Sequence, residues 1–343
     1  MPQSFRPSFC GFSVALPVNW RGARPGASAR PTRGSAISAP STPFCMKLPL
    51  RAVLPNFVFH QRGDAAIWIA RGYDEPPFLE RLMNADCLFA QGGCQIVKDQ
   101  RKIRIGRITV TISGQPRTIY VKRYNAFSWR YKLFSPFLNS GAFRSLRGAA
   151  ILRAAQIPSA PPVAAVENRR SGALVKSFFL SEEIAGGQTS DAFWRARLLG
   201  VNSTEGIVLR RRFLAELARL FRTLHDERIY HNDLKDANIM VRSDGDDFRF
   251  VLLDLDGVAK LKHLSRRRKI KNLAQLNRTL GRYVRRPEKL YFLKHYLGLA
   301  FKERSLRRRV VLSVMKESSA GGRSSNFASG NAETGWLSRT GLM

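Results

Sequence analysis

The sequence predicts an α+β protein with two lobes, a small lobe rich in strands and a helical lobe that follows it. Two patterns carry this prediction. Short stretches between residues 94 and 124 are rich in β-branched and aromatic side chains and partly alternate with period two. Residues 211–227 instead place their apolar side chains at helical spacing. With 343 residues, 44% of them hydrophobic, the chain is long enough to bury a core in one or two domains.

The elements of the small lobe follow from strand patterns, turn residues and one helical stretch that a proline ends. In chain order they are strands at 94–97, 105–112 and 118–124, with a hairpin turn at Ser113-Gly-Gln-Pro before the third, then a helix at 143–156 and a strand at 173–180.

The helical lobe begins near Gly186-Gly187, which interrupts the chain. Its predicted elements are the helix at 211–227, a buried strand at 248–255 and several basic amphipathic helices, the first with a helical pattern at 271–284.

These elements and the composition divide the chain into five segments. Both ends lack periodicity and are rich in Ser and Gly, so we expect them to be disordered. The segments are 1–47 as a disordered leader or a misassigned start, 48–87 as an N-terminal extension packed on the main domain, 88–182 as the small lobe, 183–312 as the helical lobe, and 313–343 as a disordered tail. The first segment fits either a transit peptide or a start codon placed too early, with Met46 as the initiator.

The chain carries 58 Lys and Arg against 25 Asp and Glu, a formal net charge of +33. Residues 257–312 hold eighteen bases and two acids, whereas residues 167–256 hold fifteen acids and fourteen bases. Such an excess predicts a partner rich in negative charge, which could be nucleic acid, an anionic membrane surface or a phosphorylated molecule. No apolar run is long enough for a spanning helix, so any membrane contact is expected to be peripheral.

The chemistry is concentrated in two motifs, His231-Asn-Asp-Leu-Lys-Asp-Ala-Asn and, after a strand, Leu253-Asp-Leu-Asp-Gly. Phosphoryl transfer from a nucleotide needs a carboxylate beside the attacking hydroxyl, an amide oxygen five residues later for a metal, and a second carboxylate at a strand end for Mg²⁺. Asp233, Asn238 and Asp254 supply these groups in that order. An acidic turn around a helix cap is the alternative, but it does not account for both motifs together.

Two lysines complete the predicted site. Lys235 would neutralise the transferred phosphate as charge develops. Lys122, in the strand sequence Tyr120-Val-Lys-Arg-Tyr, is expected to bind nucleotide phosphates. The alternative is that it is a solvated side chain, as most isolated lysines on strands are.

With these residues in view, the sequence resembles the protein-kinase-like superfamily and, within it, the lipopolysaccharide core kinases of the Kdo/WaaP family, over roughly residues 90–300. The resemblance rests on both motifs, on the strand around Lys122 and on the Asn-rich stretch Lys271-Asn-Leu-Ala-Gln-Leu-Asn. It implies a bilobal protein-kinase-like fold with ATP and Mg²⁺ as cofactors. The implied roles are Asp233 as the catalytic base, Asn238 and Asp254 as metal ligands, Lys122 as the ATP phosphate contact, and Glu182 and Glu183 as the hinge beside adenine.

The sequence departs from the protein-kinase pattern in the first strands. No Gly-x-Gly-x-x-Gly is present there, and Lys98-Asp-Gln-Arg-Lys occupies the turn, so Arg101 or Lys102 is expected to meet the phosphates. No Asp or Glu lies between Arg123 and Val166, so the helix carboxylate that would pair with the strand lysine is missing from its expected place.

Without that carboxylate, Lys122 is oriented either by Asp254 or by the nucleotide alone, unless the helix has been misplaced. Asp256 replaces the glycine of the Asp-Phe-Gly motif. It is expected to be a further metal ligand, with a capping group as the alternative.

The segment Ser265-Arg-Arg-Arg-Lys-Ile-Lys, with Arg304 and Arg307-Arg-Arg, follows the metal-binding strand, where an acceptor would approach. Clusters of this kind favour anionic head groups by about 1 kcal/mol for each Lys or Arg near a membrane surface. We therefore expect an anionic membrane surface as a partner, in preference to nucleic acid, with Arg210-Arg-Arg on the same face.

The sequence thus predicts an ATP-dependent kinase that phosphorylates a sugar hydroxyl, of Kdo or heptose, in the lipopolysaccharide inner core. The acceptor would be lipopolysaccharide core or a lipid A precursor, and the protein would be cytoplasmic and peripheral on the inner membrane. The alternatives are a protein kinase or an aminoglycoside-type small-molecule kinase of the same fold, or a lipid-binding pseudokinase.

Overall fold

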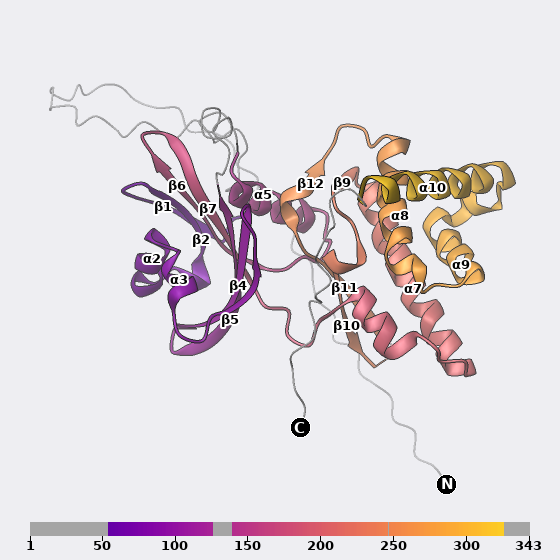
Figure 1. Ribbon diagram of the computed structural model, residues 1–343, viewed down its shortest axis with the longest axis horizontal. Helices are drawn as coiled ribbons and strands as arrows, with labels where there is room; N and C mark the ends of the chain where they lie inside the picture. Colours follow the sequence, from indigo (N-terminus) through magenta and orange to yellow (C-terminus); the bar gives the residue numbers. More distant parts are fainter. Residues whose placement is uncertain (1–53, 126–138, 246, 326–343) are drawn as a thin grey trace, which may run out of the picture. The chain divides into compact units, whose positions relative to one another are not determined.

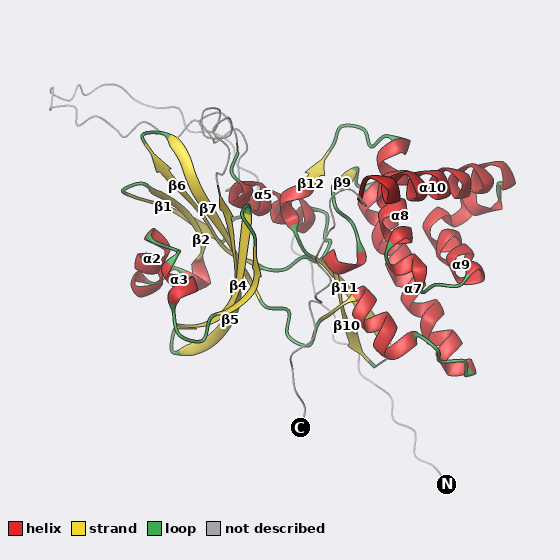
Figure 2. Cartoon of the chain, in the orientation of Figure 1, coloured by secondary structure: helices red, strands yellow, loops and turns green. Residues whose placement is uncertain are grey.

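The computed structural model describes residues 54–125, 139–245 and 247–325. The predicted leader and the last part of the predicted tail lie outside these ranges. Within them, the long strands lie before residue 183 and most of the long helices lie after residue 203, as Figure 2 shows. The predicted α+β class, with a sheet-rich region followed by a helical one, is confirmed.

The sheet-rich region is built on one antiparallel sheet of seven strands in the order β1-β2-β6-β7-β5-β4-β3 (Figure 1). The strands are β1 (Phe57–Arg62), β2 (Ala65–Ala70), β3 (Gln95–Asp99), β4 (Ile103–Ile112), β5 (Gln115–Asn125), β6 (Pro162–Arg170) and β7 (Ala173–Glu182). Strand β2 pairs with β6, with Ile67 opposite Val166. The residues before Cys87 therefore contribute two strands to the same sheet that contains Lys122.

Register in this sheet is defined by a two-residue turn between β4 and β5. Ser113 and Gly114 both have positive φ, 49° and 74°, which is the conformation that a tight hairpin of this kind requires. Ten residue pairs follow along the two strands and place Lys122 opposite Ile105. The predicted turn and both predicted strands are present, and each strand is longer than its sequence pattern.

The two faces of the sheet are covered by different helices. Successive strand residues point to opposite faces, so the neighbours Phe178 and Phe179 belong to different apolar clusters. Phe178 packs in the cluster that includes α2 (Pro76–Met83) and α3 (Cys87–Ala90). Phe179 packs in the larger cluster that includes α5 (Gly141–Ala154). Helix α5 thus lies between the sheet and the elements of the helical region that carry the second motif.

The helical region contains short strands around its loops and four long helices. In chain order the elements are β8 (Gln188–Thr189), α6 (Ser190–Phe193), η2 (Trp194–Leu198), α7 (Thr204–Asp226), β9 (Ile229–His231), η3 (Asp236–Asn238), β10 (Ile239–Asp244), β11 (Asp247–Leu252), η4 (Leu255–Gly257), β12 (Val258–Lys260), α8 (Arg266–Arg278), η5 (Leu280–Arg282), α9 (Arg286–Leu297), η6 (Gly298–Lys302) and α10 (Arg304–Ser325).

Helix α7 has a capped start and a buried stripe. The Ser203 side chain accepts a hydrogen bond from the Gly206 N–H at 3.1 Å, as helix N-caps do. Phe213, Leu217 and Phe221 follow at helical spacing and are fully buried.

Several predicted boundaries were wrong, and the helix expected at 211–227 begins already at Thr204. The strand expected at 248–255 ends at Leu252, because Asp254 adopts the left-handed conformation with φ 54°, which no strand continues. The helix expected to reach Val284 ends at Arg278 and gives way to η5. The tail expected to be disordered from Ser313 instead continues α10 to Ser325, because Val311 and Val314 pack against the core.

The structure also corrects the placement of Arg210 on the basic surface. Its side chain is buried, 5% exposed, and its Nε donates to a carboxylate oxygen of Glu288 at 2.6 Å. Glu288 lies in Arg286-Pro-Glu at the start of α9, so this ion pair joins α7 to α9. Arg211 and Arg212 are exposed on α7.

Candidate active site

The two motifs form adjacent loops that follow β9 and β11. His231 joins them: its Nδ1 accepts a hydrogen bond from the Asp233 N–H at 3.2 Å, and its Nε2 lies 3.0 Å from the Leu253 carbonyl oxygen. Because Nδ1 accepts, Nε2 carries the hydrogen and donates it. Burial lowers the pKa of His231, which favours the neutral ring that this bonding needs. The Leu253 N–H also donates to the Asn238 carbonyl oxygen at 2.9 Å, so the loops are joined on both sides.

Three of the predicted residues meet in the first loop. Lys235 Nζ lies 2.8 Å from Asp233 Oδ2. The Asn238 side-chain nitrogen donates to the same Oδ2 at 3.1 Å and to the Asp233 carbonyl oxygen at 2.8 Å. The Asp233 side chain is 43% exposed, so its carboxylate is bonded and still open to an incoming hydroxyl.

Lys122 of β5 meets the acids of the second loop. Its Nζ donates to Asp254 Oδ1 and lies 4.0 Å from Asp256 Oδ2. Burial alone would lower the pKa of Lys122, but Tyr124, Asp254 and Asp256 outweigh burial and raise this pKa. Burial would raise the pKa of Asp254, yet Lys122 lowers it overall, whereas burial, aided by the Asp254 charge, raises the pKa of Asp256. The pKa values of the two acids are therefore shifted in opposite directions although only one residue separates them.

The side chains around these loops fit a hard divalent cation. Asn238 uses its amide nitrogen for Asp233, which leaves the amide oxygen as a ligand, and Asp254 supplies a carboxylate. Among the residues that the structure describes, no group of three or more His, Cys, Asp or Glu side chains is arranged as a metal cage. Mg²⁺ in kinases takes one or two carboxylates and completes its shell with substrate phosphates and water, so a full cage is not required.

Helix α8 supports the first loop through two buried amides. The Gln275 side chain donates to the Asn232 carbonyl oxygen at 2.7 Å and accepts from the Leu234 N–H at 3.2 Å. The Asn272 side chain donates to the His231 carbonyl oxygen at 2.6 Å. Sequence reasoning identified the Asn-rich stretch as similar to a family helix but assigned no role to these amides. Asn272 and Gln275 are three residues apart in a helical stretch, and this spacing is the sequence signal that places them on one helix face.

The predicted hinge acids are bonded to the sheet. Arg107 of β4 donates to both oxygens of Glu183, at 2.7 and 3.0 Å. The Tyr73 hydroxyl donates to Glu182 at 3.0 Å, and burial and this acid raise the pKa of Tyr73 to about 12. The two carboxylates, at the end of β7, are thus bonded to structural partners on β4 and on η1 (Arg71–Tyr73).

Arg101 and Lys102 form a tight turn between β3 and β4. Gln100 and Ile103 exchange two backbone hydrogen bonds, of 2.9 and 3.1 Å, which leaves only these two residues in the turn. Their carbonyl oxygens accept from the side chain and backbone of Asn125, three residues beyond Lys122. The turn is too short to wrap phosphates with backbone amides, so any phosphate contact would come from side chains.

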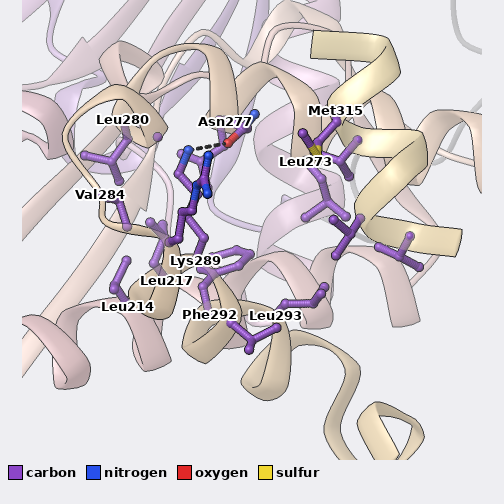
Figure 3. Close-up of a pocket in the computed structure, with 17 residues that line it drawn as sticks. Leu214, Leu217, Leu273, Asn277, Leu280, Val284, Lys289, Phe292, Leu293 and Met315 are labelled. Atoms are coloured by element: carbon purple, nitrogen blue, oxygen red, sulfur yellow. Dashed lines mark hydrogen bonds between the residues drawn. The ribbon is translucent and has the colours of Figure 1, made fainter. Parts of the chain in front are cut away.

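A cavity of about 420 Å³ lies away from these residues, among α7, α8, α9 and α10 (Figure 3). Its lining is mainly Leu and Val, and the polar contact drawn in it joins Lys289 Nζ to Asn277 Oδ1 at 3.1 Å. None of the predicted site residues lines it.

In the described part of the chain, no helix combines the length and apolar character needed to cross a bilayer.

Comparison with known proteins identifies the fold and the family. One similar solved structure is described as WaaP in complex with acyl carrier protein, with 22% sequence identity, a TM-score of 0.53, and coverage of 72% of this chain and 97% of that chain. This likeness shows a protein-kinase-like fold. Curated protein sequences give no match. The sequence model of the lipopolysaccharide kinase (Kdo/WaaP) family matches residues 89–296, more than half of the chain and both motifs. The chain therefore belongs to the lipopolysaccharide kinase (Kdo/WaaP) family.

Proposed function

We propose that this protein transfers the γ-phosphoryl group of ATP, with Mg²⁺, to a hydroxyl of Kdo or heptose in the lipopolysaccharide inner core. Family membership implies a phosphotransferase that acts on a sugar hydroxyl. The observation that carries the proposal is the joining of the two loops, which brings Asp233 and Asn238 to Asp254 through His231 and Leu253. These are the groups that phosphoryl transfer from a nucleotide requires.

Asp233 is the proposed catalytic base. The acceptor oxygen would attack the γ-phosphorus while its proton passes to the Asp233 carboxylate, and the bond from the γ-phosphorus to the bridging oxygen of ADP would break. The hydrogen bond from Asn238 orients the carboxylate, and Lys235 at 2.8 Å would share its charge between Asp233 and the transferred phosphate.

Asn238 and Asp254 are the proposed ligands of the metal, with Asp256 nearby, and Mg²⁺ when bound neutralises phosphate charge. Lys122 would contact the phosphates, since it is 16% exposed and lies beside both acids. Arg101 and Lys102 would approach the phosphates from the tight turn, and Glu182 and Glu183 would form the segment beside adenine.

A cluster of cations next to the proposed base supports an anionic acceptor. Lys271 Nζ donates to Asn232 Oδ1 at 3.4 Å, one residue before Asp233. Lys271 and Arg268 also lie over the Tyr230 ring, at 5.9 and 5.5 Å from its centroid. Phosphate or carboxylate groups of the inner core would bind these side chains while a neighbouring hydroxyl faces Asp233.

The first residues of α8 extend this cluster towards α10, since the Arg266 side chain donates to Ser313 at 3.3 Å. We propose that this basic surface contacts anionic lipid at the cytoplasmic face of the inner membrane. Co-flotation with vesicles containing anionic lipid, but not with neutral vesicles, checks this. Changing Arg266, Arg267 and Arg268 to Gln should weaken co-flotation, and unchanged binding of that variant would contradict the proposed surface.

A transfer assay tests the proposed activity. Purified protein, labelled ATP and Mg²⁺ are offered core oligosaccharide, a generic protein or an aminoglycoside, and label is expected in the oligosaccharide. Mass spectrometry of the labelled fragments then distinguishes Kdo from heptose. Asp233→Ala should abolish transfer, whereas Asp244→Ala, at the exposed end of β10, should retain it. Label in the protein or the aminoglycoside supports the corresponding kinase, and nucleotide binding without any transfer supports a pseudokinase.

A further inference from the structure

The surroundings of Lys122 explain how the site manages without a helix carboxylate. Helix α5 contains no Asp or Glu, although it contacts β5, where Lys122 lies. The ion pairs of Lys122 run instead to the second loop, to Asp254 and, at 4.0 Å, to Asp256. A single short loop therefore provides both carboxylates near the lysine.

Helix α5 contributes a cation to this arrangement. Arg144 Nη2 lies 3.9 Å from Asp256 Oδ2, and Arg144 Nη1 donates to the Asn139 carbonyl oxygen at 3.0 Å. The guanidinium is thus attached to the start of its own helix and reaches the same oxygen of Asp256 that faces Lys122. Asp256 lies between one cation from the sheet and one from the helix.

The fit of α5 against the loop keeps this contact in place. A Cβ at Gly148 would lie 2.2 Å from the Leu255 carbonyl oxygen, so only glycine permits this approach of helix to loop. On the same helix face, Ser145 bonds to the Tyr124 hydroxyl at 2.9 Å, and Gly141 lies against the Tyr124 ring. Close packing on both sides of Arg144 leaves the helix little freedom to shift relative to Asp256.

We infer that Asp256, fixed by Arg144 of α5, takes the place of the missing helix carboxylate and positions Lys122 on the nucleotide phosphates. This inference rests on the proposed kinase function. Once Asp254 serves the metal, Asp256 is the other acid of the described chain paired with Lys122. In the protein-kinase pattern the helix supplies the carboxylate that pairs with the strand lysine. Here the helix supplies Arg144, the loop supplies the carboxylate of Asp256, and both act together to orient Lys122.

Nucleotide binding in EDTA tests this role apart from any metal. Asp256→Asn should weaken ATP binding in EDTA by about fivefold or more, and combining it with Lys122→Met should weaken binding no further than Lys122→Met alone. If Asp256 served only as a metal ligand, its negative charge would repel the ATP phosphates in EDTA, and removing that charge would not weaken binding. Equal or tighter binding by Asp256→Asn, with a loss only when Mg²⁺ is present, would overturn the inference.

Substitutions at Arg144 provide the second part of this nucleotide-binding experiment. Arg144→Gln should also weaken binding in EDTA, and Arg144→Lys, which keeps the charge, should restore most of it. Arg153→Gln, an exposed arginine in the last turn of α5, is the matched control and should bind like the wild type. Thermal unfolding of each variant separates misfolding from mispositioning.

The outcomes also separate this inference from the function on which it rests. If the wild-type chain binds ATP and both Arg144→Gln and Asp256→Asn bind it equally well, the positioning role is wrong and the kinase proposal stands. A wild-type chain that binds no nucleotide would contradict both.

Discussion

The site loops, residues 231–238 and 253–257, and the apolar cavity of the helical region differ in what occupies them. The loops carry acids that pair at short range with Lys235 and with Lys122 of β5, and they leave Asp233 partly exposed. The cavity has a volume of about 420 Å³ but is lined mainly by Leu and Val. The candidate active site is thus recognised by its paired and oriented charged groups, and not by the volume of a cavity. Substitutions in the loops should remove activity at little cost in stability, and substitutions at the cavity should do the reverse.

After the loss expected for Asp233→Ala, the largest effect is expected at Asp254. Asp254→Asn keeps the shape and removes the charge that would hold the metal, so transfer should fall by about 10²-fold or more. The protein should unfold at nearly the wild-type temperature. Asp247→Asn, at the exposed start of β11, is the control and should keep its activity. A wild-type rate for Asp254→Asn would remove the second loop from the site.

Leu217 tests the other side of the comparison. It is fully buried on α7 and lines the cavity, so Leu217→Ala should lower the free energy of unfolding by about 2–5 kcal/mol. Activity per folded molecule should be unchanged. Denaturant unfolding measures the loss, with Leu299→Ala, at an 86% exposed position, as the control. If Leu217→Ala kept its stability but lost turnover, the cavity would be part of the active site.

Stability should also depend on pH through His225, which lies between Tyr296 and Asn272. Burial lowers its pKa to about 4, below the value of roughly 6.5 in an unfolded chain. Above pH 6.5 its contribution to stability is fully present, and it is lost as pH falls towards 4, where the unfolded state takes up the proton first. The loss should approach about 3 kcal/mol by pH 4. Unfolding measured at several pH values should show a shallower dependence in His225→Gln.

Helix α8 spans both regions and offers the finest test. Gln275 bonds to the first loop, whereas Asn277 of the same helix lines the cavity. Gln275→Leu leaves the Asn232 carbonyl oxygen and the Leu234 N–H without their partner, so kcat should fall, with a stability cost of about 1–3 kcal/mol. Asn277→Leu should leave kcat unchanged. Equal kcat values for the two variants would show that α8 does not support the loop.

Local patterns accounted for much of this protein. The hairpin turn, the strand around Lys122, the stripe of α7 and both motifs depend on residues close together in the chain, and each lies where expected. What was missed depends on partners far away. Strands β1 and β2 belong to the main sheet because β2 pairs with β6, about a hundred residues later, and no short pattern encodes that pairing.

Two other predictions were wrong for the same reason, the start of the tail and the exposure of Arg210. Residues after Ser313 look like a tail by composition, but Val311 and Val314 find an apolar core to bury against and the helix continues. Arg210 looks like part of a basic surface, but Glu288, 78 residues away, makes it a buried ion pair. Propensity is weak beside such contacts.

The sequence by itself determined the family, the kinase-like chemistry and the identity of Asp233, Asn238, Asp254 and Lys122 as candidate site residues, because spacing within a motif encodes those groups. Only the tertiary structure decided which charge faces which: that Asp256 lies between Lys122 and Arg144, that His231 joins the two loops, and that two amides of α8 support the first. The physical reason is that such contacts join helix, strand and loop across the fold, and their geometry is defined only when those elements pack.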